Sequence, residues 1–202
     1  MAFEEAVAAY DAVDAAFDQA DAVGVDGLSN DERAELLGRR EAWRRRLPAG
    51  GHELINELGR APVEQLGGPL RAVLADRLRI GRGEAAGRIA EAADLGPRRA
   101  LSGEPLAPRL EATAARQRWG VIGAEQVRVI RRFFERLPGV VDEPTRAEAG
   151  RRLAAVAAAY RPDELARFAD HMALVLNPDG FFPMRIGPAG AVSRWARRAP
   201  TG

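Results

Sequence analysis

The sequence contains no cysteine and no lysine, and only 6% of its residues are aromatic. Without cysteine the chain forms no disulfide, zinc ribbon or thiol nucleophile, so a reducing compartment such as the cytoplasm is the expected location. All 30 basic residues are arginines, as a GC-rich coding bias produces, so only a local arginine pattern can indicate function. Alanine is abundant, and a core of small and aliphatic side chains favours closely packed helices.

Long apolar runs are also absent. No uninterrupted apolar stretch approaches the roughly 20 residues that span a bilayer, so we expect no membrane partner. The acidic N-terminal segment around Glu4 and Glu5 lacks the basic start and apolar stretch of a secretory signal. With 202 residues, 47% of them hydrophobic and 29% charged, the sequence predicts one sizeable domain with extensions.

The net charge of +1 hides an uneven distribution. The chain has acids but no arginine up to Glu32, a basic segment at 39–46, and arginines without acids after Asp179. Such runs are typical of solvated helix faces and a polar tail. Two alternatives are an acidic arm that folds onto the basic helix and a basic patch that binds nucleic acid.

Apolar residues at steps of three and four predict helices along most of the chain. The expected helices are 3–22, 31–47, 54–58, 70–78, 82–93, 110–119, 126–137, 145–160 and 162–176. Asn30 is the expected N-cap of the second helix, and Pro48 with Gly50 and Gly51 is expected to end it. No segment alternates as a strand does, so we predict an all-α, multi-helix bundle. Its predicted parts are an N-terminal helical extension at 1–65, a helical domain at 66–180 and a flexible basic tail at 181–202.

Several segments after Leu70 follow one another in the order of a known family. They are residues 78–86, 96–114, 120–130, 145–149, 162–165 and 176–180. Through them, over a little more than half of its length, the chain resembles the family called domain of unknown function 222, or the 13E12 repeat proteins.

The resemblance implies a helical domain of unsettled function that commonly precedes an HNH-type endonuclease module. Such a module holds a divalent metal in a histidine-rich ββα site, often beside cysteine pairs. This sequence has no cysteine and no neighbouring histidine pair, it has Gln126 where many relatives carry histidine, and it ends soon after residue 180. We therefore expect an HNH endonuclease-associated region that lacks the nuclease site.

Residues 74–89 fit a helix-turn-helix motif. Its inward positions would be filled by Leu74, Ala75, Leu78, Ile80, Ala85 and Ile89. The outward residues Arg82, Glu84 and Arg88 could then reach a DNA major groove. Against this, Arg79 stands where the turn usually has glycine, and Gly83 and Gly87 each weaken the second helix by about 1 kcal/mol. The alternative is a plain helical hairpin inside a bundle.

The basic segment at 39–46 offers a second candidate for binding DNA. Arg39, Arg40 and Arg44 surround Trp43, and arginine binds phosphates and stacks on aromatic rings. In the alternative interpretation, Trp43 packs with neighbouring leucines and the arginines are only solvated.

The sequence predicts no catalytic residue, metal site or cofactor. His52 is expected in an exposed loop, and His171 lacks the acid three residues earlier that a helical di-metal centre requires. The adjacent carboxylates at 142–143 and 163–164 stand near helix starts, where negative charge is favourable.

Two hypotheses remain for the function. The leading one is an accessory or regulatory helical domain that binds double-stranded DNA. The other is a non-enzymatic interaction module whose helices at 3–22 and 31–47 contact a protein partner or a second copy.

Overall fold

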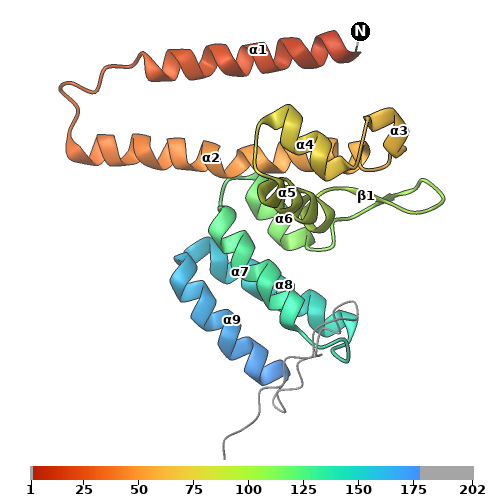
Figure 1. The fold of residues 1–202 in the computed structure, drawn as a ribbon. Helices are drawn as coiled ribbons and strands as arrows, with labels where there is room; N and C mark the ends of the chain where they lie inside the picture. Colours follow the sequence, from red (N-terminus) through yellow and green to blue (C-terminus); the bar gives the residue numbers. More distant parts are fainter. Residues whose placement is uncertain (1, 178–202) are drawn as a thin grey trace, which may run out of the picture. The chain divides into compact units, whose positions relative to one another are not determined.

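The computed structural model describes residues 2–177, and these form helices with one small hairpin of strands (Figure 1). The helices are α1 (Ala2–Asp21), α2 (Asn30–Leu58), α3 (Val63–Leu66), α4 (Leu70–Leu78), α5 (Arg82–Leu95), α6 (Glu111–Arg118), α7 (Ala124–Arg136), α8 (Glu143–Ala159) and α9 (Pro162–Leu176). The antiparallel strands β1 (Arg98–Arg99) and β2 (Pro105–Leu106) lie between α5 and α6. The all-α prediction is confirmed, and the predicted tail at 181–202 lies outside the described residues.

Helix α2 is much longer than predicted, because it continues through Pro48 to Leu58. A proline lacks the N–H that a helix interior needs, so its local preference is to end the helix. Tertiary contacts hold the second half instead: His52 is buried, Ile55 packs on α4 and α5, and Asn56 donates hydrogen bonds to backbone carbonyls beyond α2. Packing therefore overrides propensity here. The prediction that His52 lies in an exposed loop is wrong, since it is only 4% exposed.

Helix α2 begins with a capping box that includes Ser29 rather than Asn30. The Glu32 N–H donates to Ser29 Oγ over 3.3 Å, and the Ser29 N–H donates to Glu32 Oε2 over 2.7 Å. These reciprocal bonds satisfy donors that a helix start otherwise leaves unpaired. The hydrogen bond from the Ser29 backbone lowers the pKa of Glu32 below its usual value.

Two other helix starts use acids, as their position in the sequence predicts. Asp142 accepts a hydrogen bond from the Thr145 N–H over 2.8 Å at the start of α8. Glu164 accepts one from the Arg161 N–H over 3.0 Å at the start of α9. The adjacent carboxylates at both places therefore have a structural role.

The contacts divide the chain into two compact units, one up to Arg44 and one from Arg45 onward. The predicted boundary near residue 65 stays a prediction. In the first unit the rings of Phe17 and Trp43 meet edge to face at 5.6 Å, and Asp21 of α1 pairs with Arg40 of α2. No residue of α1 is buried.

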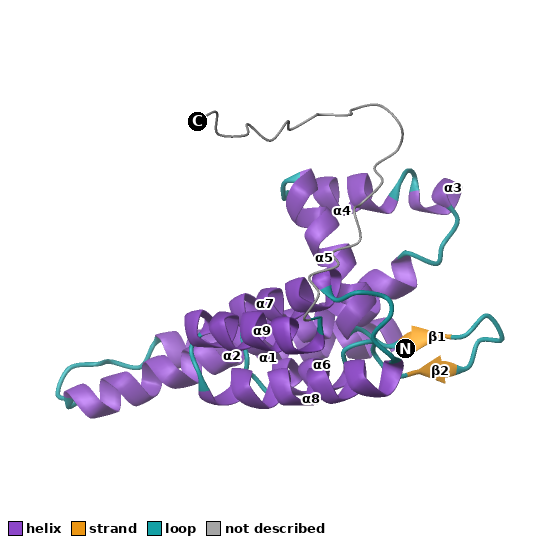
Figure 2. Cartoon of the chain, turned by 90° about the horizontal axis from the view of Figure 1, so that it is seen from below, coloured by secondary structure: helices purple, strands orange, loops and turns teal. Residues whose placement is uncertain are grey.

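In the second unit the main core lies between α7, α8 and α9, which run side by side in Figure 2. Its largest fully buried apolar side chains are Phe133, Ile122, Ile130, Leu153, Leu165 and Val127. Alanines of α8 and α9 line the same core, so the helices approach closely, as the alanine-rich composition predicts.

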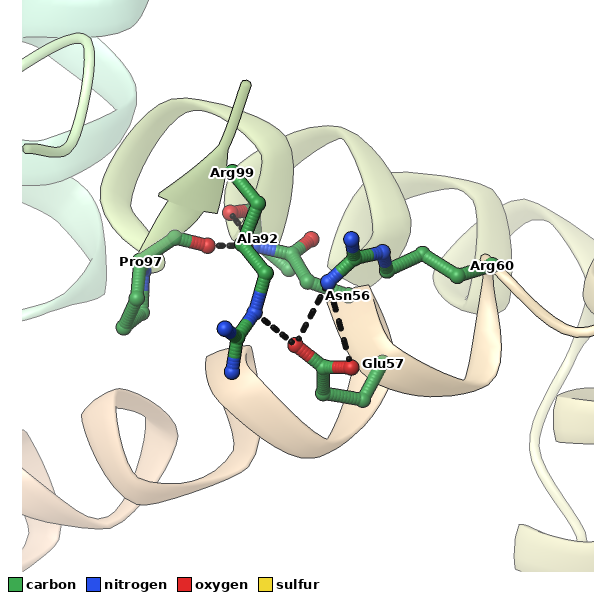
Figure 3. A network of polar contacts seen from close by, with 6 residues as sticks. All are labelled: Asn56, Glu57, Arg60, Ala92, Pro97 and Arg99. Atoms are coloured by element: carbon green, nitrogen blue, oxygen red, sulfur yellow. Dashed lines mark hydrogen bonds and ion pairs between the residues drawn. The ribbon is translucent and has the colours of Figure 1, made fainter. Parts of the chain in front are cut away.

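A polar network joins the second half of α2 to α5 and the β-hairpin (Figure 3). Asn56 Nδ2 donates to the carbonyls of Ala92 at 2.9 Å and Pro97 at 3.1 Å. Glu57 lies between Arg60 and Arg99, and the hydrogen bond from Arg99 lowers its pKa.

A second, more buried network lies nearby and connects α2, α5 and α6. Glu91 Oε1 is 3.4 Å from His52 Nε2 and accepts a hydrogen bond from Gln117 Nε2 at 3.0 Å. Burial raises the pKa of Glu91, but the hydrogen bonds from His52 and Gln117 outweigh it, so the net shift is downward. The network therefore favours the ionised carboxylate at the meeting point of three helices.

Within residues 2–177, no helix combines the length and the apolar character needed to cross a bilayer.

Candidate nucleic-acid interface

Helices α4 and α5 are joined by a tight turn at residues 79–81. Arg79 has a left-handed backbone, with φ 53° and ψ 44°, and is the one non-glycine residue with positive φ in the described part of the chain. The N–H groups of Arg79 and Ile80 both donate to the carbonyl of Ala75. Such a left-handed residue closes a helix and reverses the chain direction, a position where glycine is usual.

Small and aliphatic side chains hold the two helices together. Ala85 is fully buried, and Leu74 and Ala75 are 4% and 6% exposed. Ile80 and Ile89 pack against this cluster, together with residues of α2 and α4. The structure thus places a hairpin here, as both interpretations of residues 74–89 require. One inward position is wrong: Leu78 is 48% exposed, because Ile80 beyond the turn packs on the cluster instead.

The predicted outward residues of α5 are all exposed. Arg82, Glu84 and Arg88 lie on its first two turns, and Arg88 forms an ion pair with Glu84 one turn away. A Cβ at Gly83 or Gly87 would meet nothing within 4 Å, so neither glycine is required by internal packing. No side chain caps the start of α5, so the N–H groups of its first turn are left for solvent or a ligand.

The hairpin carries more arginine than α5 alone suggests. Between residues 70 and 88 there are five arginines and two acids, Asp76 and Glu84. The side chains of four of these arginines are exposed and form no ion pair or hydrogen bond with any residue in the range 2–177: Arg71, Arg77, Arg79 and Arg82. Arg71 and Arg77 were not predicted as site residues, because the sequence does not show whether an arginine has a partner.

The arginines of the other candidate, on α2, are already paired with acids. Arg39 contacts Glu35 over 2.8 Å, Arg44 contacts Glu41 over 2.7 Å, and Arg40 contacts Asp21. The last contact supports the interpretation in which an acidic arm folds onto the basic helix. The edge-to-face contact of Trp43 with Phe17 was not predicted. DNA would have to displace acids here, which weakens this second candidate.

Among the described residues, no group of three or more potential ligands could hold a metal ion. His171 is exposed on α9, and the neighbouring Asp170 pairs with Arg136 over 2.9 Å. Gln126 is buried, where its amide accepts from the Gly123 N–H and donates to the Ala157 carbonyl. At this position the glutamine therefore joins α7 to α8.

The described residues thus form a mainly helical protein with an arginine-bearing helical hairpin in its second unit. The chain belongs to the family described as "Domain of unknown function (DUF222)", which matches residues 34–197. The resemblance found in the sequence is thereby confirmed.

The chain is similar to several mycobacterial proteins that carry no functional name. It is 51% identical over 178 residues to an uncharacterized protein of Mycobacterium tuberculosis, which covers 88% of this chain and 39% of the relative. It is 54% identical over 156 residues to the uncharacterized protein Rv1128c of the same species, covering 77% of this chain and 35% of the relative. It is 48% identical over 180 residues to the uncharacterized protein Mb1179c of Mycobacterium bovis, covering 89% and 40%. The chain thus spans about two fifths of the length of these relatives. No protein of known structure matches it.

Proposed function

We propose that this chain is an accessory or regulatory DNA-binding domain and that α4 and α5 form its helix-turn-helix. The observation that carries the proposal is a set of four exposed arginines whose side chains form no ion pair in the described chain: Arg71 and Arg77 on α4, Arg79 in the turn and Arg82 at the start of α5. Arginine binds phosphate through a planar fork of donors, and a helix N-terminus adds N–H groups and a positive dipole end. A cytoplasmic location, where chromosomal DNA is accessible in bacteria, belongs to the same proposal.

The backbone geometry and packing of the hairpin support this function, in addition to its charge. A helix-turn-helix needs a small residue in the first helix, a reversal after it and an apolar plug in the turn. Ala75 is buried against the second helix, Arg79 makes the reversal and Ile80 packs beneath it. Ile55 of α2 packs on the same cluster and gives the hairpin a third, supporting helix.

Two groups of residues on the hairpin would make different contacts with DNA. Arg71, Arg77 and Arg79 would contact phosphates, which fixes position without reading sequence. Arg82, Glu84 and Arg88 would meet base edges, where arginine prefers guanine and a carboxylate accepts from cytosine. Binding of Arg88 to a base requires its present ion pair with Glu84 to open.

The accessory role rests on the family. The resemblance implies a helical region that commonly precedes an HNH endonuclease module, and the chain spans only part of its longer relatives. A helical domain that holds DNA near a nuclease would account for that arrangement.

Fluorescence anisotropy with a labelled duplex tests the proposal. We expect binding at about 50 mM salt that falls steeply by about 200 mM, because arginines on phosphates release condensed counterions. The double variant Arg82→Ala/Arg88→Ala should bind more weakly while its helical circular dichroism is unchanged. The matched control is Arg128→Ala/Arg132→Ala on α7, which removes the same charge from exposed positions outside the hairpin. An equal loss of DNA affinity in the two double variants would contradict the proposal. So would the absence of binding at low salt with tens of micromolar protein.

The exposed face of α1 favours a second function, self-association through the N-terminal helices. Phe3, Val7, Tyr10 and Val13 follow one face of α1 and are 80%, 40%, 62% and 46% exposed. An isolated helix of this length is marginal in water without packing of its apolar face.

The same apolar face of a second copy is the partner that could cover this face of α1. All charged residues of α1 are acids, and pairing with α2 arginines of the other copy would require those arginines to leave their present acidic partners. Contacts of this kind are self-complementary and close into a two-fold dimer. Light scattering coupled to size exclusion should then give twice the chain mass, and Phe3→Ser/Tyr10→Ser should give the monomer. A monomeric wild-type chain contradicts this second function.

A further inference from the structure

A pocket of about 760 Å³ lies in the second unit, away from α4 and its turn. Its walls come from α6, α8, Phe134 of α7 and the residues around the β-hairpin. The volume falls in the range of small-molecule sites. The proposed DNA-binding hairpin does not use this pocket.

Four arginines line the pocket, against two acids, Glu111 and Glu143. The arginines come from separate parts of the chain: Arg98 from β1, Arg109 from the segment before α6, and Arg146 and Arg151 from α8. Like charges are unfavourable when brought together without a counterion, so this wall favours an anion.

Three of the arginines keep donors for a ligand. Arg98 uses Nε for the Ala107 carbonyl at 2.8 Å, which leaves its terminal nitrogens. Arg109 has only a long contact of 3.8 Å to Asp94. Arg146 donates one nitrogen to the Pro138 carbonyl at 3.4 Å and lies over the Phe134 ring at 5.8 Å. Stacking of this kind orients a guanidinium while leaving its other N–H groups available. Arg151 is occupied by Glu148 at 2.6 Å.

A buried hydroxyl adds an independent observation. Thr113 lines the pocket and is 1% exposed, and its Oγ1 has no hydrogen-bond partner within the described residues. A buried hydroxyl without a partner is unfavourable, and most such groups in native proteins are satisfied. Because the Oγ1 atom is inaccessible as it stands, it can hydrogen-bond to a ligand in this pocket only after the Thr113 side chain rotates.

From these features we infer that the pocket binds a phosphate group, held by Arg98, Arg109 and Arg146, with Thr113 able to join it. A phosphate offers several acceptor oxygens and a charge of about −2 as a monoester or −1 in a nucleic-acid backbone, which suits guanidinium groups that line one pocket. The phosphate belongs either to a small molecule or to the backbone of nucleic acid, and the chemistry of the pocket is the same for both.

Nuclear magnetic resonance of the full chain with inorganic phosphate tests the inference. The Nε–H resonances of Arg98 and Arg146 should shift and saturate, while sodium chloride at equal ionic strength should not shift them in the same way. The variant Arg109→Gln/Arg146→Gln should raise the Kd for phosphate at least about tenfold, as expected when a charge-assisted contact is lost. The control Arg132→Gln removes an exposed arginine outside the pocket and should leave the Kd unchanged. Thr113→Val, which keeps the shape of the side chain, provides a variant without a charge change and should also weaken binding.

A second measurement, of binding to duplex DNA, distinguishes between the two sources of phosphate. If Arg109→Gln/Arg146→Gln weakens phosphate binding but not duplex binding, the ligand is a small phosphate-bearing molecule. If both weaken together while Arg82→Ala/Arg88→Ala affects only the duplex, the pocket holds a backbone phosphate. Absence of saturable shifts with phosphate, or equal shifts in the variant and the wild type, overturns the inference.

Discussion

The left-handed backbone of Arg79 predicts that glycine is more stable than alanine at this position, the reverse of the usual order in a helix. Replacing a residue inside a helix by glycine rather than alanine normally costs about 0.5–1 kcal/mol, because glycine loses more conformational freedom on folding. At Arg79 the order should reverse, since a Cβ in the left-handed region is disfavoured by roughly 1–2 kcal/mol. Arg79→Gly relieves that strain. Arg79→Ala also removes the guanidinium, but it retains the Cβ and therefore the strain.

The expected difference in stability between the two variants is the relief of left-handed strain minus the conformational freedom that glycine loses on folding. Relief of about 1–2 kcal/mol, less the loss of about 0.5–1 kcal/mol, leaves Arg79→Gly more stable than Arg79→Ala by about 0–1.5 kcal/mol, with a midpoint of about 0.8 kcal/mol. Arg132 in the middle of α7 is exposed and forms no ion pair with the described residues, so it is a matched position with helical backbone. There Arg132→Ala should be more stable than Arg132→Gly by about 1 kcal/mol.

Urea unfolding of the four variants measures these differences, with the midpoint compared at a common slope. If Arg79→Ala is more stable than Arg79→Gly, the turn is not left-handed and the helix-turn-helix interpretation fails. Both variants of Arg79 lack the guanidinium, so they should lose the same affinity for DNA. A difference between them in binding would mean that the turn, rather than the charge, governs it.

Three further predictions concern the second unit. In Gly96→Ala the new Cβ would lie 2.6 Å from the Ala92 carbonyl oxygen, so chemical unfolding should show a loss of about 1–3 kcal/mol, and an unchanged midpoint would contradict the packing. The lowered pKa of Glu91 means that its stabilisation is present above the ordinary carboxyl pKa and lost as the pH falls through the lower folded value. The difference in unfolding free energy between wild type and Glu91→Gln should therefore shrink below about pH 4.3, and a constant difference would contradict the role of the network. Purified chain should not cut DNA with magnesium, manganese, zinc or nickel, and cleavage that His171→Ala abolishes would show that a nuclease site was missed.

Much of the fold follows from local sequence patterns, and the exceptions have physical causes. Helices α4 and α5 and the acidic helix starts near Asp142 and Glu164 follow from apolar spacing and capping chemistry. The continuation of α2 past Pro48 does not, because it depends on contacts of His52 and Asn56 with segments about 40 residues away.

The candidate site was predictable only in its backbone. The spacing of Ala75, Ile80 and Ala85 indicates the hairpin, and the structure gives it the expected burial. The pairing of charges was not predictable, since Arg40 pairs with Asp21 from another helix while the exposed Arg71 forms no ion pair in the described chain. Periodicity describes one helix at a time, whereas pairing depends on which helices meet.

Amide chemical-shift mapping with duplex DNA tests the central claim most directly. On titration at about 50 mM salt, the resonances of α4, the turn at Arg79 and the first half of α5 should shift in proportion to bound DNA. Those of α9 should stay in place and serve as the internal reference. Shifts confined to other helices, or none at saturating duplex, would contradict the claim that α4 and α5 bind DNA.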